Sequence, residues 1–219
     1  MVQSKQLLNF STLKHYFLEK NDNEFSILSD SIIANCIRLE QTHSNNVVIA
    51  NKNIKYYKST DGIVINFESY ISIRTADCLP IFLYDSKKNV LAGIHAGWKG
   101  LYRNIIGNTV KVMRNLGCNA LDIRSAIGPH IRSCCYKITD EFLELFRNYN
   151  NENIHLIKKN GTNKFFDLEK LASFQMTELG VLKKNIDIIP YCTSCDSRFC
   201  SYRKNGANCG RMLNIAGIV

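Results

Sequence analysis

The chain has 219 residues, 45% of them hydrophobic, and its 28 Lys and Arg against 19 Asp and Glu give a net charge of +9. This length can bury one core without splitting, so we expect a single domain spanning residues 1–219. No apolar run reaches the ~20 residues of a membrane helix, and residues 1–9 lack the order of a signal peptide. The sequence therefore predicts a cytoplasmic protein with no membrane partner.

The basic residues are spread along the chain. A charge of +9 would suit an acidic partner, but pairs such as Lys87–Lys88 and Lys158–Lys159 are isolated from one another. A nucleic-acid interface needs Lys and Arg gathered on one face. We therefore predict a solvated basic surface and no nucleic-acid partner, while the oligomeric state stays open.

Short β-branched or apolar runs dominate the first half and predict strands. In chain order they are Asn46–Ala50, Gly62–Ile65, Tyr70–Arg74, Leu79–Tyr84 and Asn89–Ile94. Later segments have helical spacing and stop signals, and they predict three helices before one late strand. These segments are Leu101–Leu116, Thr139–Tyr149, Asp167–Leu179 and the strand Ile186–Pro190. Strands gather first and helices alternate later, so the sequence predicts an α+β domain with mixed β-sheets.

Three stretches place a metal-binding side chain at the end of a predicted strand. They are Gln41-Thr42-His43-Ser44, Thr75-Ala76-Asp77-Cys78-Leu79-Pro80 and His95-Ala96-Gly97-Trp98-Lys99-Gly100. Two imidazoles and one thiolate suit zinc, and three protein ligands leave a fourth position open, as catalytic sites require. We therefore predict a zinc site formed by His43, Cys78 and His95.

The residues of these motifs resemble those of a known family. His-Ala-Gly-Trp-Lys-Gly together with Thr-Ala-Asp-Cys-Leu-Pro is similar to the laccase-domain, multicopper polyphenol oxidase-like proteins, now regarded as purine nucleoside phosphorylases with adenosine deaminase activity. Further blocks follow in family order and cover nearly the whole chain. They are Gln41-Thr42-His43, Asp61-Gly62, Ala126-Ile127-Gly128-Pro129, Asp167-Leu168, Phe199-Cys200-Ser201-Tyr202-Arg203-Lys204 and Gly210-Arg211-Met212.

The resemblance implies a fold, a metal and a reaction. The fold would be layered α/β/β/α in a single domain, and the zinc would be held by His43, Cys78 and His95. The activity would be phosphorolysis of adenosine, inosine, guanosine or methylthioadenosine, with adenosine deamination as a second reaction. The partners would be small-molecule purine nucleosides and phosphate. Lys99 stands where the family commonly has Arg, and Lys137 stands where it often has Glu.

Four further residues are candidates for the chemistry. Lys99, Arg203 and Arg211 are candidate substrate-binding cations for the phosphate oxygens, although each would also suit an exposed surface position. Asp77 adjoins the ligand Cys78 and is the candidate catalytic acid or base. Its alternative role is to orient a ligand or cap a turn.

Three other interpretations remain open. Copper also binds His and Cys, so a copper-dependent polyphenol oxidase is one, although five histidines are few for several copper centres. A second is a cysteine hydrolase with Cys78 as its nucleophile. The third is a zinc-stabilised binding module built from the C-terminal cysteines. These are Cys192, Cys195, Cys200 and Cys209.

Overall fold

The computed structural model describes residues 1–22, 32, 36–147 and 155–219. Its centre is a mixed six-stranded sheet in the order β13-β9-β7-β8-β5-β3, in which only the outer pairs, β13–β9 and β3–β5, are parallel. The strands are β3 (Val47–Ile49), β5 (Gly62–Ile65), β7 (Leu79–Asp85), β8 (Val90–Ala96), β9 (Arg124–Ile127) and β13 (Ile186–Ile188). Mixed sheets with separate helices confirm the predicted α+β class.

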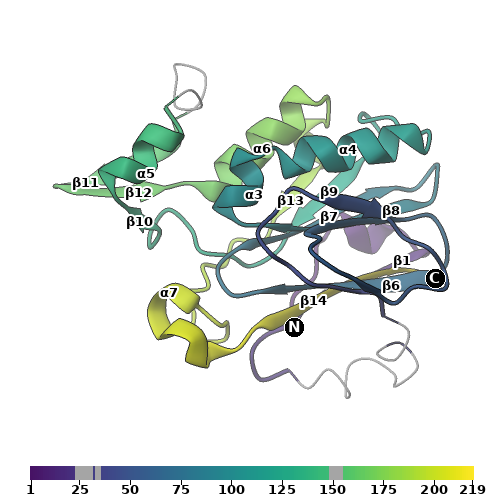
Figure 1. Cartoon of the computed structure of the whole chain (residues 1–219), viewed down its shortest axis with the longest axis horizontal. Coiled ribbons are helices and arrows are strands. Elements are labelled where there is room, and N and C mark those ends of the chain that lie inside the picture. The colour runs from purple at the N-terminus through teal and green to yellow at the C-terminus, as the bar shows by residue number, and fades with distance from the viewer. Residues whose placement is uncertain (23–31, 33–35, 148–154) are drawn as a thin grey trace.

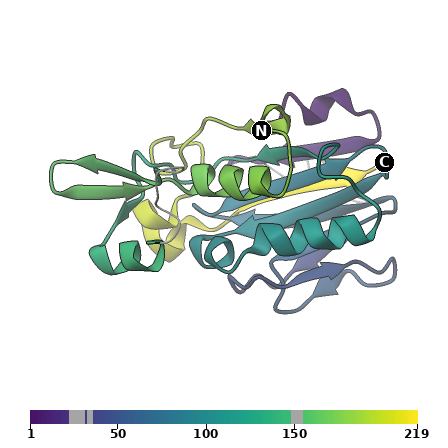
Figure 2. The same cartoon turned by 90° about the horizontal axis from the view of Figure 1, so that it is seen from above.

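Alternation along the central strands assigns one face of this sheet to the helices and the other to a second sheet. In β7, Ile81 and Leu83 face the helices, whereas Phe82 and Tyr84 face the second sheet, and all four are fully buried. Figures 1 and 2 show a layer of α-helices on one face of this sheet. These helices are α3 (Trp98–Tyr102), α4 (Ile105–Asn115) and α6 (Leu168–Glu178).

The second sheet joins the two ends of the chain. It has the order β1-β14-β6, all antiparallel, with strands β1 (Leu13–Phe17), β14 (Met212–Ile218) and β6 (Ser69–Thr75). The layer of helices, the central sheet and the second sheet form three of the four layers that the resemblance implies. On the outer face of the small sheet, Ile215 packs against Ile32, which lies in a stretch that is otherwise outside the described residues.

Smaller elements extend from one end of the two main sheets (Figures 1 and 2). They include the sheet β10-β12-β11 and the helices α5 and α7, whereas the strand pair β2–β4 lies beside β6. Their bounds are β10 (Lys137–Ile138), β11 (Ile157–Asn160), β12 (Asn163–Phe166), β2 (Arg38–Leu39), β4 (Tyr56–Tyr57), α5 (Asp140–Leu145) and α7 (Tyr202–Asn205). Three short 3-10 turns complete the described elements: Leu7–Asn9, Lys183–Asn185 and Gly206–Cys209.

The predicted helix Leu101–Leu116 is interrupted. The structure ends α3 at Tyr102 and begins α4 at Ile105, because Asn104 adopts a left-handed conformation with φ of 63° and its side chain accepts a hydrogen bond from Gly107 N. The predicted helix Thr139–Tyr149 is α5, capped by Thr139, and its expected last residues, from 148, lie outside the described residues. No helix in the described part of the chain is long and apolar enough to cross a membrane.

Candidate metal and nucleoside site

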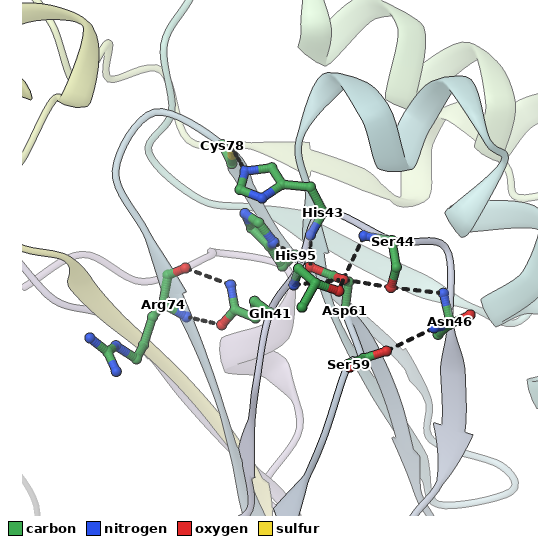
Figure 3. A network of polar contacts seen from close by, with 10 residues as sticks. Gln41, His43, Ser44, Asn46, Ser59, Asp61, Arg74, Cys78 and His95 are labelled. Atoms are coloured by element: carbon green, nitrogen blue, oxygen red, sulfur yellow. Dashed lines mark hydrogen bonds and ion pairs between the residues drawn. The ribbon is translucent and has the colours of Figure 1, made fainter. Parts of the chain in front are cut away.

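The three predicted ligands meet at one end of the central sheet (Figure 3). His43 lies in the loop before β3, Cys78 lies in the turn between β6 and β7, and His95 lies near the end of β8. Their ligand atoms lie within 4.8 Å of one another. The distance from Cys78 Sγ to His43 Nε2 is 3.8 Å. Tetrahedral zinc with bonds of about 2.3 Å to sulfur and about 2.1 Å to nitrogen would hold these atoms about 3.6 Å apart, so the spacing fits the metal.

Asp61 organises this ligand group from beneath. Its carboxylate is fully buried and lies 2.7 Å from His95 Nδ1. The same carboxylate accepts hydrogen bonds from His43 N at 3.0 Å and from Ser44 N at 2.7 Å. With Nδ1 engaged by Asp61, His95 has Nε2 left to bind a metal, and the carboxylate fixes the orientation of its ring.

The His43 loop is held in a conformation that the backbone rarely adopts. His43 has φ of 59°, a left-handed conformation that costs strain energy. The backbone N–H groups of Thr42, His43 and Ser44 all donate to the Asp61 carboxylate, and these hydrogen bonds offset the strain. Gln41 anchors the start of the loop, because its side-chain amide forms two hydrogen bonds with the backbone of Arg74 in β6, at 2.7 and 2.8 Å (Figure 3). The Gln-Thr-His motif thus supplies both a candidate ligand, His43, and the hydrogen bonds that hold its loop in place.

The surroundings change the acidity of the ligands. Burial acts to raise the pKa of the Cys78 thiol, but hydrogen bonds with His43 and His95 outweigh it and lower the pKa to about 6. Burial acts to lower the pKa of His95, but Asp61 and Cys78 outweigh it and raise the pKa to about 9. Cys78 is therefore available as a thiolate at neutral pH, which is the form that binds metals.

A cavity of about 950 Å³ opens over the ligand group. Two kinds of side chain dominate its wall, aromatic rings and guanidinium groups. They are Tyr56, Trp98, Tyr136, Tyr202, Arg38, Arg74, Arg203 and Arg211. Flat rings can stack on a flat heterocycle, and guanidinium groups can bind phosphate oxygens. The cavity thus combines a metal-binding group with surfaces suited to an aromatic and anionic ligand pair.

Asp77 lies in the cavity wall beside Cys78 and is almost fully buried. Thr193 Oγ1 donates to its Oδ1 at 2.6 Å, and Arg203 N donates to its Oδ2 at 2.6 Å. Its φ of 85° is left-handed, so the backbone at the β6–β7 turn is strained at the position that presents Cys78. Both roles expected for Asp77 remain compatible with this geometry, since it orients the turn and borders the cavity.

The predicted cations occupy different places. Arg203 and Arg211 line the cavity, and the Arg203 guanidinium lies 5.0 Å from the centre of the Tyr136 ring and donates to Lys137 O. Lys99 is exposed on α3 beside Trp98 and is absent from the described residues that line the cavity. The Lys137 side chain is also exposed, so its departure from the family pattern lies outside the cavity wall.

Sequence reasoning missed several residues of this site. Asp61 stands in the sequence as part of an Asp-Gly pair, and its contacts with the loop of residues 42–44 and with His95 arise only from the fold. Tyr136 follows the two cysteines Cys134 and Cys135 and gave no signal of its own. Arg74 is the last residue of a predicted strand, where the sequence alone indicates a surface residue. In the structure it lines the cavity above the candidate ligands.

The fold and site define an α+β protein with a His₂Cys group in an aromatic, cationic cavity. The chain belongs to the family described as multi-copper polyphenol oxidoreductase laccase, whose model matches residues 18–219. A purine nucleoside phosphorylase from Clostridium acetobutylicum is 33% identical over 200 residues, covering 90% of this chain and 82% of that protein. An adenosine deaminase, RL5, from an unknown prokaryotic organism is 30% identical over 184 residues, covering 78% and 70%.

The fold is shared with a solved structure. The crystal structure of the hypothetical protein YfiH from Bacillus licheniformis superposes with a TM-score of 0.85 at 24% identity, covering 94% of this chain and 93% of that one. This likeness concerns the architecture, and it supports the α+β fold with mixed sheets that the resemblance implies.

Proposed function

We propose that this protein is a zinc-dependent purine nucleoside phosphorylase that cleaves adenosine, inosine, guanosine or methylthioadenosine with phosphate. Adenosine deamination would be a second reaction of the same site. One observation carries the proposal: the three ligand atoms converge within 4.8 Å of one another on the wall of an aromatic and cationic cavity. The names of the curated relatives support both reactions.

The donor set suits zinc. Two imidazoles and a thiolate are borderline-soft ligands, and the carboxylate behind His95 is the usual partner of a zinc-bound imidazole. His43, Cys78 and His95 would hold the ion and leave one position toward the cavity. A zinc ion bound there supplies Lewis acidity, which polarises a substrate oxygen or lowers the pKa of water.

The chain's own residues would bind both phosphate and base within this cavity. Arg203 and Arg211 offer planar donor groups that match phosphate oxygens, and four arginines line the cavity against two carboxylates, Glu40 and Asp77. The rings of Trp98 and Tyr136 provide faces for the purine. Lys99 stays a proposed phosphate contact, reached only by a rearrangement of its exposed side chain.

Asp77 is the proposed acid–base group. In phosphorolysis, negative charge grows on the departing purine, so a group that donates a proton to the base stabilises the transition state. The two hydrogen bonds that its carboxylate accepts from Thr193 and Arg203 fix it at the cavity wall. Asp77 would take up a proton from solvent or phosphate and pass it to the departing base.

The proposal is tested by comparing His95→Ala with His155→Ala, an exposed histidine outside the ligand group. Each purified protein is stripped of metal, reconstituted with zinc or copper, and incubated with adenosine or inosine, with and without phosphate. We expect phosphate-dependent release of free base from the zinc-loaded wild type and His155→Ala, and none from His95→Ala.

Several results would contradict this function. Equal turnover by metal-free and zinc-loaded protein would refute the metal's role. Oxidation of phenols in proportion to bound copper would instead favour the oxidase. Rapid alkylation of Cys78 that zinc fails to slow would favour the cysteine hydrolase, because a thiolate bound to zinc is a poor nucleophile.

A further inference from the structure

A second group of thiols lies outside the candidate active site. Cys134 and Cys135 come from the turn after β9, and Cys192 and Cys195 come from the turn after β13. The four sulfur atoms lie within 4.8 Å of one another, although about 60 residues of sequence separate the two pairs. We propose that these four cysteines form a structural zinc site that fastens the two turns together.

The spacing fits four sulfur ligands around one ion. Cys195 Sγ lies 3.2 Å from Cys135 Sγ and 3.5 Å from Cys134 Sγ. Zinc–sulfur bonds of about 2.3 Å in a tetrahedron put sulfur atoms about 3.8 Å apart. A disulfide would join two of the thiols and leave the other two crowded beside it, whereas one cation uses all four.

The two turns are built to present their thiols to the same point. Cys135 N and Tyr136 N both donate to Arg132 O at 2.9 Å, and Asp196 N donates to Cys192 O at 3.0 Å. Arg132 N also donates to Cys192 Sγ at 3.5 Å. A backbone N–H directed at sulfur favours its thiolate form, and Cys-x-x-Cys is a common spacing for zinc ligands.

Charges around the cluster suit an anionic centre. Zinc with four thiolates carries a net charge of about −2. Arg132 and Lys158 line a hollow together with Cys134, Cys192 and Cys195, and none of the described residues of that hollow lines the active-site cavity. Arg132 shares its charge with Glu169, at 2.8 Å, and Asp196 in the same hollow is paired with Arg198 at 2.7 Å. Lys158 is thus the cation left to face the cluster.

The cluster differs from the module that the sequence suggested. Cys192 and Cys195 take part, but Cys200 and Cys209 lie elsewhere, with Cys200 Sγ donating to Cys209 O. Their places are taken by Cys134 and Cys135. Thr193, between the two C-terminal ligands, donates to Asp77, so the zinc site would also fix the turn that supports the active-site wall. The site itself requires no assumption about the reaction.

The first test uses the unmutated protein. Cys134 and Cys195 are exposed, so free thiols at these positions would react quickly with a maleimide. In zinc-loaded wild type we expect their labelling, read by peptide mass spectrometry, to be slower than after chelation by about tenfold or more. Cys209 should label at the same rate in both samples. Equal labelling of Cys134 and Cys195 with and without zinc would overturn the proposal, as would a disulfide in the zinc-loaded protein.

The second test counts the ions. In Cys78→Ser the first site has lost its thiolate, so any zinc with four sulfur neighbours by X-ray absorption belongs to the second site. We expect one such ion per chain in Cys78→Ser and in Cys78→Ser/Cys209→Ser, and none in Cys78→Ser/Cys195→Ser. Zinc bound through nitrogen or oxygen only, or no zinc in Cys78→Ser, would contradict the site.

Discussion

At the residue scale, Asp61 determines the positions of two candidate ligands, although it does not line the cavity itself. It is fully buried, yet it is held ionised: burial acts to raise its pKa, but hydrogen bonds with His95 and Ser44 outweigh this and lower the pKa to about 2. A buried carboxylate of this kind fixes both imidazole ligands, one through its ring and one through its backbone. The metal affinity of the proposed site should therefore depend on a residue that is not itself a ligand.

Replacing Asp61 by Asn should weaken zinc binding by about 10–100-fold, because the His95 ring loses its anionic partner. A competition titration with a chromogenic chelator measures the change. Asp85→Asn is the matched control, since Asp85 is equally buried but its carboxylate accepts hydrogen bonds from Lys87 N and Lys88 N in a turn away from the ligands. Unchanged zinc affinity in Asp61→Asn would show that the carboxylate only supports the loop.

One substitution at Asp77 distinguishes its proposed acid–base role from a role in supporting the β6–β7 turn. In Asp77→Asn the side chain keeps an oxygen to accept one hydrogen bond, so the turn should persist and zinc content should stay at the wild-type level. Loss of the proton-transferring group should lower kcat by about 10²–10⁴-fold with little change in KM. Steady-state kinetics with inosine and phosphate measures this. A kcat within a few-fold of wild type would assign Asp77 to the turn alone.

The ligand residues themselves could be predicted from the sequence, because each stands in a short motif at the end of a readable strand. Asp61 could not be ranked in the same way, since its importance comes from contacts with residues 42–44 and 95 that only the fold creates. The Cys134–Cys135 pair likewise gave no sign of its partners, which lie about 60 residues away in the sequence.

At the scale of elements, the start of α3 is packed directly against the metal ligands. Gly97 caps this helix, and a Cβ added there would lie 2.9 Å from His43 Cδ2 and 3.0 Å from Cys78 Sγ. Both distances are too short for comfortable packing, so the glycine leaves the space in which the ligands approach one another.

Gly97→Ala should therefore push His43 and Cys78 apart. We expect zinc affinity to fall by about tenfold or more, equivalent to about 1.4 kcal/mol, because the backbone of Gly97 has a conformation that alanine also adopts and the crowding is the main change. Calorimetric titration with zinc measures the affinity, and the circular dichroism of the apo-protein controls for misfolding. A folded variant with the zinc affinity of the wild type would show that the His43 loop accommodates the added methyl group, which would contradict this prediction.

A buried histidine ties the N-terminal segment to β1. His15 is 1% exposed, and its Nε2 accepts a hydrogen bond from Ser4 N at 2.8 Å, so the folded protein holds the ring neutral. Burial lowers its pKa to about 4, against the opposing charge of Asp187. The unfolded chain takes up this proton near pH 6.5, so the contribution of His15 to stability is present above about pH 6.5 and is lost as the pH falls toward about 4.

His15→Gln should remove this part of the acid sensitivity, because the amide can accept from Ser4 N but does not titrate. Over the window from about pH 6.5 to about 4, the wild type should lose about 3 kcal/mol more of its unfolding free energy than the variant. Urea unfolding at several pH values measures the difference, with the exposed His155→Gln as control. Parallel stability curves for wild type and His15→Gln would contradict the burial argument.

Elements with clear periodicity were predicted closely, and those that depend on distant partners were missed. The strands β5, β7 and β8 have apolar runs that the sequence displays directly. In β14, by contrast, Asn214 interrupts the apolar pattern, and it is tolerated because it donates to Ile73 O and Thr75 Oγ1 in β6. The strand β11 carries Lys158 and Lys159 on an exposed hairpin and shows no alternation.

At the scale of the whole molecule, strands from the two ends of the chain complete the second sheet. Strands β1 and β14 pair with each other, and β14 pairs with β6, whose last residue precedes the turn that carries Asp77 and Cys78. The sequence predicted mixed sheets and the helical layer, but it gave no indication that the two termini complete the second sheet. That arrangement places the C-terminal Arg203 and Arg211 beside ligands from the first half of the chain.

The most direct test of the central claim is anomalous diffraction at the zinc edge from crystals of the zinc-loaded protein soaked with phosphate and inosine. We expect a peak bonded to His43, Cys78 and His95, with its fourth position open to a ligand in the cavity between Trp98, Tyr136, Arg203 and Arg211. A site without zinc, or nucleoside and phosphate bound away from these three side chains, would contradict the claim.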